Sequence, residues 1–246
     1  MFKFLSKSEI AQIQSKIKVP FIYLVKGIRL KSYQDLYALN FLKNIRNAKI
    51  AEIGGGFSRI LFKLHKSNSK FNYDKFEGQG GGPKFIQEFL FRLLNPKVKI
   101  LNKYLGNKEV LSDQQGSYDY IYSISVIEHI PINSLSDFFK DTVLLLKKGG
   151  VCLHLIDMYL ASDGEDDELV SENIERFNIY KKCIDENNEL EFLSSDIVDS
   201  MQFKNSYISN PDNIMFSWNK RIPELSKTRY ISQSVSLVIA YKKNDY

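Results

Sequence analysis

Residues 48–58, which read A-K-I-A-E-I-G-G-G-F-S, constrain the fold more than any other part of the chain. An apolar run that ends at Ile53 is followed by three glycines, and a helical pattern continues from Arg59 to Leu64. A strand, a tight turn and a helix in this order are typical of a βα unit in an open parallel sheet. Glycines let the backbone turn sharply and let a ligand come close, and the N–H groups that begin the predicted helix would point at that ligand.

Two kinds of ligand are compatible with such a turn. A nicotinamide dinucleotide requires G-x-G-x-x-G, but the third glycine position is Arg59, whose long side chain does not fit there. An acidic residue followed by x-G-x-G matches Glu52, Gly54 and Gly56. With this pattern the chain resembles the class I S-adenosylmethionine-dependent methyltransferases. The resemblance implies that the loop, Gly55 included, wraps the methionine end of the cofactor, and that Glu52 belongs to the network that holds its ammonium group.

A second block, residues 117–131, reads S-Y-D-Y-I-Y-S-I-S-V-I-E-H-I-P and matches the same family. Ser123 and Ser125 lie near the carboxyl end of the predicted fourth strand, where ligands bind in open α/β sheets, and we expect both to contact the cofactor. Methyltransferases that act on DNA bases carry Asp/Asn-Pro-Pro-aromatic or Pro-Cys motifs, and this block holds Ser-Val-Ile-Glu-His instead. Nucleic-acid bases are therefore not expected as acceptors.

Further cofactor contacts are predicted after the second and third strands. Asp74 follows the predicted strand 71–73, about 20 residues beyond Gly54, where an acidic side chain reaches the ribose hydroxyls. Lys75 is included in this site, and Glu77 is the rival for the ribose. After the third strand, 98–101, Asn107 takes the position from which the family contacts adenine, more often with an aspartate. The glycine-rich residues 77–83 indicate a loop before a helix over 83–94, rather than an anion site.

The catalytic candidates follow from the chemistry that the resemblance implies. A sulfonium methyl group is already activated, so the enzyme has to align a nucleophile and remove its proton. His129 is the first choice for general base or substrate orienter, although it could instead hold the start of the next helix. Asp157, at the end of the predicted fifth strand 151–156, and His154 within that strand are the other candidates. No metal is predicted, because the acidic side chains that could join Asp157 are better explained as a helix start; these are Asp163, Asp166 and Asp167.

The 246 residues suit one doubly wound, mostly parallel α/β sheet with additions. Residues 1–46 are expected to precede the first strand as a helical lid or packing segment, with Ser6 or Ser8 capping the first helix. Residues 47–246 are expected to form the cofactor-binding domain, in which residues 158–230 shape the acceptor pocket. Residues 234–241 alternate as a strand, and the family places such a strand antiparallel at the edge of the sheet.

Composition limits the compartment and the classes of binding partner that we expect for this protein. A hydrophobic share of 43% and a charged share of 26% are those of a soluble globular protein, and no apolar stretch or leader indicates a membrane span or secretion. The two distant cysteines indicate neither a zinc site nor a disulfide framework, so we expect a cytoplasmic protein. The net charge of +5 is spread along the chain, which indicates anionic small molecules rather than nucleic acid. Nothing indicates the oligomeric state.

The predicted function is S-adenosylmethionine-dependent O-methylation of a small polar acceptor, with S-adenosylhomocysteine as product. At residues 74–78 and 123–129 the chain is similar to methyltransferases of bacterial surface-polysaccharide (capsule or O-antigen) pathways. The resemblance implies a sugar or nucleotide-sugar acceptor, phosphorylated sugars included. An NAD(P)-dependent oxidoreductase or epimerase is the alternative, disfavoured by Arg59 and by the lack of a suitably placed Tyr-x-x-x-Lys pair. A non-catalytic cofactor-binding subunit is the third interpretation.

Overall fold

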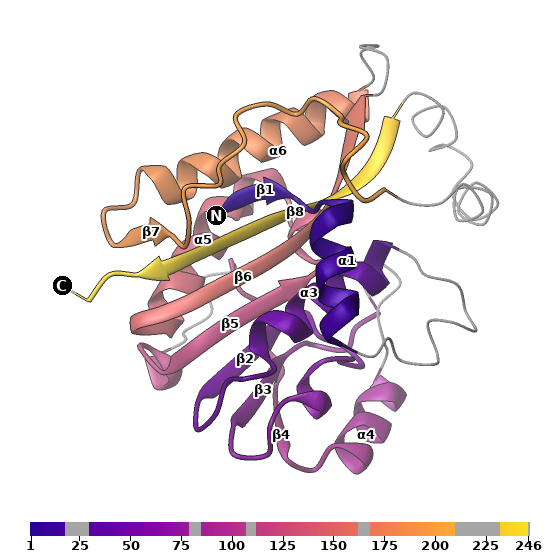
Figure 1. The fold of residues 1–246 in the computed structure, drawn as a ribbon. Helices are drawn as coiled ribbons and strands as arrows, with labels where there is room; N and C mark the ends of the chain where they lie inside the picture. Colours follow the sequence, from indigo (N-terminus) through magenta and orange to yellow (C-terminus); the bar gives the residue numbers. More distant parts are fainter. Residues whose placement is uncertain (18–29, 79–84, 107–111, 162–167, 210–231, 246) are drawn as a thin grey trace.

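A computed structural model describes residues 1–17, 30–78, 85–106, 112–161, 168–209 and 232–245. Its centre is an eight-stranded sheet in the order β1-β8-β6-β5-β2-β3-β4, with β7 also paired to β8 (Figure 1). The strands are β1 Phe2–Phe4, β2 Lys49–Ile53, β3 Ser69–Tyr73, β4 Val98–Leu101, β5 Tyr118–Ile124, β6 Leu146–Ala161, β7 Leu190–Phe192 and β8 Ser232–Lys243. The helices are α1 Lys7–Lys16, α3 Leu30–Leu42, α4 Phe85–Leu94, α5 Ile132–Leu145 and α6 Glu168–Asp185, with 3₁₀ turns η1 Leu61–Lys63, η3 Ser112–Gln114 and η4 Ile127–His129.

The predicted doubly wound topology is confirmed. Strand β2 pairs in parallel with β3 on one side and β5 on the other, and the parallel set continues to β4 and β6. From β2 the chain first builds outward through β3 and β4, then returns to place β5 on the other side. The switch point therefore lies between β2 and β5, and ligands of such sheets bind at its carboxyl edge.

Helices cover both faces of the sheet. Helices α5 and α6 pack on one face and α1 and α3 on the other, with α4 beside β3 and β4 (Figure 1). Strand β2 shows how the sequence supports both layers: Ala51 and Ile53 belong to the apolar cluster on the α5–α6 side, whereas Ile50 belongs to the opposite cluster. A parallel strand that is buried on both faces reads as a continuous apolar run, which is why this segment was readable from the sequence.

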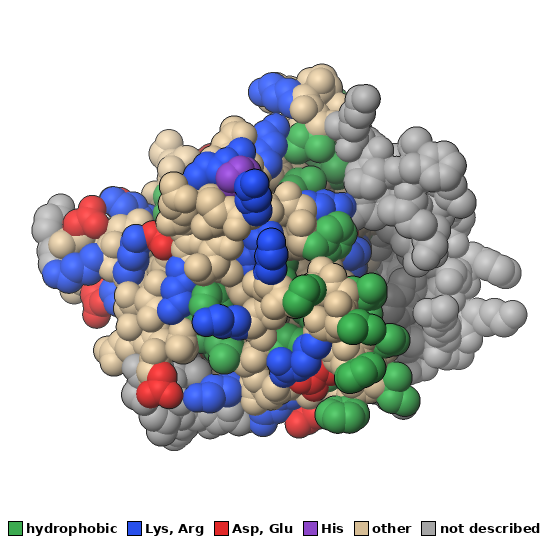
Figure 2. All heavy atoms as spheres, turned by 90° about the horizontal axis from the view of Figure 1, so that it is seen from below, with side chains coloured by type: hydrophobic (Ala, Val, Ile, Leu, Met, Phe, Trp, Pro, Cys, Tyr) green, Lys and Arg blue, Asp and Glu red, His purple; other side chains and the backbone are tan. Residues whose placement is uncertain are grey.

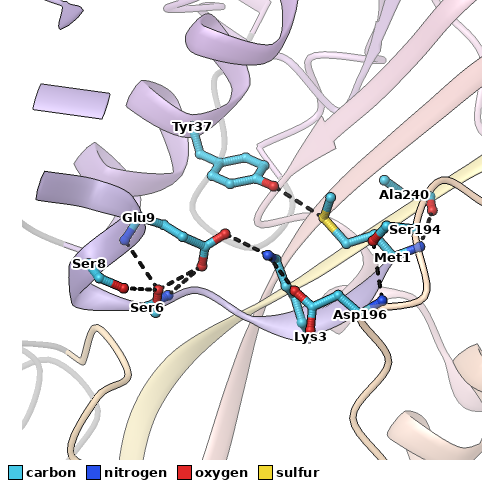
Figure 3. A network of polar contacts seen from close by, with 9 residues as sticks. All are labelled: Met1, Lys3, Ser6, Ser8, Glu9, Tyr37, Ser194, Asp196 and Ala240. Carbon is cyan, nitrogen blue, oxygen red and sulfur yellow. Dashed lines mark hydrogen bonds and ion pairs between the residues drawn. The ribbon is translucent and has the colours of Figure 1, made fainter. Parts of the chain in front are cut away.

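The prediction that residues 1–46 precede the first strand is wrong. Strand β1 pairs antiparallel with β8, in the register Phe2 to Ile239, so β8 is not the edge strand that the sequence predicted. The Lys3 ammonium lies 2.6 Å from the carboxylates of both Glu9 and Asp196, which ties β1 to α1 and to a segment late in the chain (Figure 3). Three residues with alternating burial are too short a pattern to identify a strand from sequence.

The start of α1 agrees with the sequence. Ser6, one of the two predicted caps, accepts a hydrogen bond from the Glu9 N–H, and the Glu9 carboxylate accepts one from the Ser6 N–H (Figure 3). This reciprocal pair is a capping box, which satisfies two N–H groups that the helix leaves without partners.

The α-helix predicted after the glycine turn is also wrong, because residues 61–63 form only the 3₁₀ turn η1. Ser58 Oγ accepts from the N–H groups of Ile60 and Leu61, and the Arg59 guanidinium forms two hydrogen bonds, of 2.5 and 2.8 Å, with the buried Asp35 carboxylate of α3. Strand β3 already begins at Ser69, so the residues left between these anchors and β3 are too few for a long helix. Among the described helices, none is long and apolar enough to cross a membrane.

Candidate active site

The glycine turn at the end of β2 is shaped by its close neighbours. Gly54 has φ +62°, and a Cβ at this position would lie 2.6 Å from the Val126 side chain. A Cβ at Gly55 would lie 2.5 Å from Asn72 Oδ1. Both contacts are closer than carbon atoms tolerate, so the turn depends on glycine. Because Val126 immediately precedes η4, the first contact also joins the turn to the segment that bears His129, the first choice for general base.

Asp74 lies where the sequence placed it, directly after β3. One carboxylate oxygen accepts from the Gly56 N–H at 2.8 Å and the other from the Phe76 N–H at 2.7 Å. Burial raises the pKa of Asp74, while these two N–H groups oppose the shift. The carboxylate therefore fixes the glycine turn against the end of β3, and its contact with a ribose stays a prediction. Beside it, the Lys75 ammonium lies 4.5 Å from the centre of the Tyr104 ring, and Tyr104 donates to Glu77.

Glu52 lies beneath the turn with 4% of its surface exposed. It accepts a hydrogen bond of 2.9 Å from the Tyr122 hydroxyl of β5. Burial raises the pKa of Glu52 to about 7, although Ser58 and Tyr122 oppose the shift. The neighbouring Asn72 donates to the Gly56 carbonyl, while its buried Oδ1 has no hydrogen-bond partner among the described residues. A carboxylate and an orphaned amide oxygen beside a glycine turn suit a cationic ammonium group, so these residues fit the methionine end of S-adenosylmethionine.

Ser123 and His154 face the interior. Ser123 Oγ and His154 Nδ1 are 2.8 Å apart, and His154 Nε2 lies 3.1 Å from Cys152 Sγ and 3.3 Å from the Tyr241 hydroxyl. Both residues have no exposed surface, and burial lowers the pKa of His154 to about 3. This imidazole is a neutral part of the core between β5, β6 and β8. Its surroundings do not favour the catalytic role predicted for it, nor the cofactor contact predicted for Ser123.

Ser125 and Asp157 are brought together by a residue that the sequence did not indicate. Gln34 of α3 donates to Asp157 Oδ1 at 2.6 Å and to Ser236 Oγ at 3.0 Å, and its amide oxygen accepts from the Ser125 hydroxyl at 2.9 Å. Ser125 has φ +51°, and its N–H donates to the Leu155 carbonyl. Strand β6 continues past Asp157 to Ala161, so Asp157 lies inside this strand and not at its end, although β5 has already ended at this level.

Glu128 is the second residue that the predictions missed. Both of its carboxyl oxygens are buried and have no hydrogen-bond partner among the described residues. Burial and the charge of Asp157 raise its pKa well above the usual range, and burial likewise raises the pKa of Asp157. His129 Nε2 lies 4.0 Å from Glu128 Oε1, while the His129 side chain is 63% exposed. The sequence did offer a signal for Glu128, because it directly precedes His129 and lies just as close to the end of the fourth strand.

The chemistry of this edge follows from those environments. Burial lowers the pKa of His129, which keeps the imidazole neutral and able to accept a proton at neutral pH. The two buried carboxyl groups cannot both ionise without cost, so Glu128 and Asp157 hold a proton between them more readily than isolated carboxylates do. The predicted adenine contact Asn107 and the acidic residues Asp163, Asp166 and Asp167 lie outside the described residues. Within the described ranges, no three His, Cys, Asp or Glu side chains form a metal-binding group.

Comparisons with known proteins agree with this reading of the fold. No protein-family model and no curated protein sequence matches the chain. Among solved structures, a Haemonchus contortus phosphoethanolamine N-methyltransferase 2 with bound S-adenosylhomocysteine matches at TM-score 0.54 and 15% identity, over 86% of this chain and 52% of that one. This chain thus spans about half the length of that enzyme.

Two further structures match over more of their own length. A protein described as a candidate sarcosine dimethylglycine methyltransferase of Galdieria sulphuraria matches at TM-score 0.55 and 16% identity, over 99% of this chain and 92% of that one. The geranyl diphosphate C-methyltransferase of Streptomyces coelicolor matches at TM-score 0.56 and 12% identity, over 87% and 79%. These proteins act on different acceptors, and what they share with this chain is the architecture. The chain has the fold of the class I S-adenosylmethionine-dependent methyltransferases.

Proposed function

We propose that this protein is an S-adenosylmethionine-dependent methyltransferase that methylates a hydroxyl group of a small polar acceptor, preferably a sugar or nucleotide sugar. The observation that carries the proposal is the contact between Gly54 and Val126. It brings the glycine turn against the segment that bears Glu128 and His129, so a site for the cofactor adjoins a set of proton acceptors at one edge of the sheet. The family fold supports the same arrangement.

The residues divide into two groups. Glu52, Asn72 and the glycine turn would hold the cofactor, with Asp74 fixing the turn and available to the ribose. Bound S-adenosylmethionine supplies an activated methyl group on its sulfonium sulfur, and transfer leaves S-adenosylhomocysteine. We assign to His129 the proton that the acceptor hydroxyl loses as its oxygen forms the new bond to carbon.

Glu128 and Asp157 are positioning residues for this step. Glu128 and Asp157 together keep one negative charge when they share a proton, and this charge beside His129, whose Nε2 lies 4.0 Å from Glu128 Oε1, stabilises the imidazolium that forms when the acceptor's proton arrives. Asp157, held by Gln34, raises the pKa of His129 against the effect of burial. Gln34 thereby links the N-terminal part of the chain to the acceptor side of the site.

The first test is calorimetric titration with S-adenosylhomocysteine, NAD and NADP. We expect binding of S-adenosylhomocysteine alone. Gly55→Ala should weaken it at least about tenfold, because the new Cβ meets Asn72 and Glu52. Gly116→Ala is the control: unlike Gly55 it has a positive φ, of +59°, but no atom lies within 4 Å of the added Cβ, so affinity should be unchanged. Binding of a dinucleotide instead would overturn the proposal.

The acceptor is then identified by methyl transfer to nucleotide sugars and sugar phosphates. A second candidate class is an amine, because neither oxygen of the buried Glu128 carboxyl has a hydrogen-bond partner among the described residues, and a bound ammonium group would favour its ionised form. Two of the similar structures are of an N-methyltransferase and of a candidate sarcosine dimethylglycine methyltransferase. Phosphoethanolamine and sarcosine therefore belong in the same panel, and methylation of these amines but of no sugar would replace the first proposal.

A further inference from the structure

Helix α4 carries its apolar stripe on the outside. Six large apolar side chains are between 43% and 76% exposed: Phe85, Ile86, Phe89, Leu90, Leu93 and Leu94. Their spacing places them on one face of the helix, whereas the buried positions are Glu88 and Phe91. A helix on the surface of a globular protein normally has the opposite arrangement. Figure 2 shows a gathering of exposed apolar side chains on this face of the molecule.

The stripe does not hold α4 to the rest of the protein. Phe91, which is 1% exposed, does so through ring contacts with Phe57 at 5.6 Å and Phe76 at 6.4 Å. The buried Glu88 carboxylate is bonded by Arg92 of the same helix. Phe57 is itself 39% exposed and extends the apolar surface beyond α4. Contiguous exposed apolar surface of this kind marks a site of interaction.

The segment of the chain that carries the stripe is strongly basic. Residues 57–103 contain ten Lys and Arg against three Asp and Glu, an excess of seven, which is larger than the +5 of the whole chain. Lys66 and Lys97 are exposed near the starts of β3 and β4. Lys66 lies near His65, and Lys97 lies near a further lysine, Lys70. Figure 2 shows Lys and Arg side chains beside the apolar ones, with few Asp or Glu.

We propose that α4 docks this protein on the surface of an anionic lipid bilayer. The helix would lie in the plane of the membrane, with its apolar stripe among the acyl chains and the surrounding lysines on the lipid phosphates. A second copy docked through this face would bring two like-charged surfaces together, which costs free energy, whereas an anionic surface matches both features. Docking through α4 would not depend on which residues catalyse the reaction.

Co-sedimentation of the full chain with lipid vesicles tests the proposal. One set of vesicles contains phosphatidylglycerol and phosphatidylcholine in equal parts, the other phosphatidylcholine alone. We expect binding to the anionic set only, weakened by salt. Phe85→Ser/Phe89→Ser/Leu93→Ser should lower the partition coefficient at least about tenfold. Lys66→Gln/Lys97→Gln should lower it on the order of tenfold, because each cation near an anionic surface contributes separately.

Matched controls lie on the opposite face of the sheet. Leu144→Ser/Ile174→Ser removes exposed apolar side chains from α5 and α6. Lys140→Gln/Lys182→Gln removes exposed cations from the same helices. Both should bind as the unmodified protein does. Circular dichroism establishes that each variant is folded, and Phe89→Ser alone replaces the triple variant if that one is not.

Three results would overturn the proposal. The first is equal binding to both vesicle sets or to neither, and the second is unchanged binding by the stripe variant. The third is self-association in sedimentation velocity that the stripe substitutions abolish, without any binding to vesicles. This last result would assign the face to a second copy of the chain.

Discussion

At the scale of single residues, the proton positions at the carboxyl edge are set by burial. The pKa of His129 is lowered by burial, and the nearby charges of Lys31 and Arg176 act in the same direction, while Asp157 opposes them. For Glu128 the same burial acts with the opposite sign, because the charged form of a carboxyl is its deprotonated form. A neutral imidazole therefore lies beside a carboxyl pair that retains a proton, which is an arrangement suited to receiving one more.

His129→Ala should lower kcat by about 10²- to 10⁴-fold, because it removes the proposed general base. The affinity for S-adenosylhomocysteine should stay within about twofold, since no cofactor contact is assigned to this side chain. In the unmodified protein, activity should fall as acid protonates the imidazole, with a midpoint below 6.5 because the pKa of His129 is lowered. Values of kcat measured across pH test the loss of activity and its pH dependence, and titration with S-adenosylhomocysteine tests the affinity. His65→Ala, far from the edge, serves as the control, and an unchanged kcat for His129→Ala would refute the assignment.

The raised pKa of Glu52 should make the stability of the protein depend on pH. Its pKa rises from 4.5 to about 7 on folding, so the native state binds the proton more tightly, and stability falls as the pH rises between these values. The group should account for a loss of about 3 kcal/mol in the free energy of unfolding across this range. Glu52→Gln cannot titrate and should lack that share of the loss in urea unfolding. Identical pH profiles for the two proteins would contradict this.

At the scale of elements, the crossover from β2 to β3 departs from the common pattern of a strand followed by a long helix. The Arg59 guanidinium is bound by the Asp35 carboxylate of α3, which is only 2% exposed. Arg59, whose side chain disfavours a dinucleotide-binding turn, thus has a second role. It fastens the N-terminal helix α3, and with it Gln34, to the segment that follows the glycine turn.

Arg59→Met should lower the free energy of unfolding by about 2 kcal/mol, because it leaves a buried carboxylate without its cation. The expected cost is below that of a fully buried pair since the Arg59 side chain is 43% exposed and water can reach the site. Lys182→Met is the comparison. The side chains of Lys182 and its partner Glu186 are both 68% exposed, so the loss in the free energy of unfolding should stay under about 1 kcal/mol. Chemical denaturation measures the free energy of unfolding of both variants. Equal losses would show that the Arg59–Asp35 pair stabilises the protein no more than an exposed ion pair does.

At the scale of the whole molecule, β1 joins the two ends of the described chain. Phe2 has no exposed surface and packs edge-on against Phe177 of α6 at 4.9 Å and Phe192 of β7 at 5.9 Å. The backbone N of Met1 donates to the Ala240 carbonyl of β8, which lies 239 positions away in the sequence. The edge of the sheet is thus closed by segments that are distant along the chain (Figures 1 and 3).

Phe2→Ala should cost about 3–5 kcal/mol of stability, as expected for a large buried ring that leaves a cavity. Amide hydrogen exchange in the paired residues 237–239 of β8 should accelerate, because β1 protects that part of the strand. Phe62→Ala, whose side chain is 55% exposed, should cost less than about 1 kcal/mol. Similar costs for the two substitutions would mean that β1 contributes little to the sheet.

The sequence by itself determined the elements whose signals are local. The glycine turn, the parallel strands β2 to β6 and Asp74 follow from apolar runs, glycines and the residues directly after each strand, all within a short window of the chain. Tertiary structure alone decided how distant segments meet. It placed β1 beside β8, brought Gln34 to Asp157, buried Glu128 near a second carboxyl and turned His154 into the core. The reason is physical: strand pairing and burial depend on which surfaces come together in space, and that information is shared among residues far apart in the sequence.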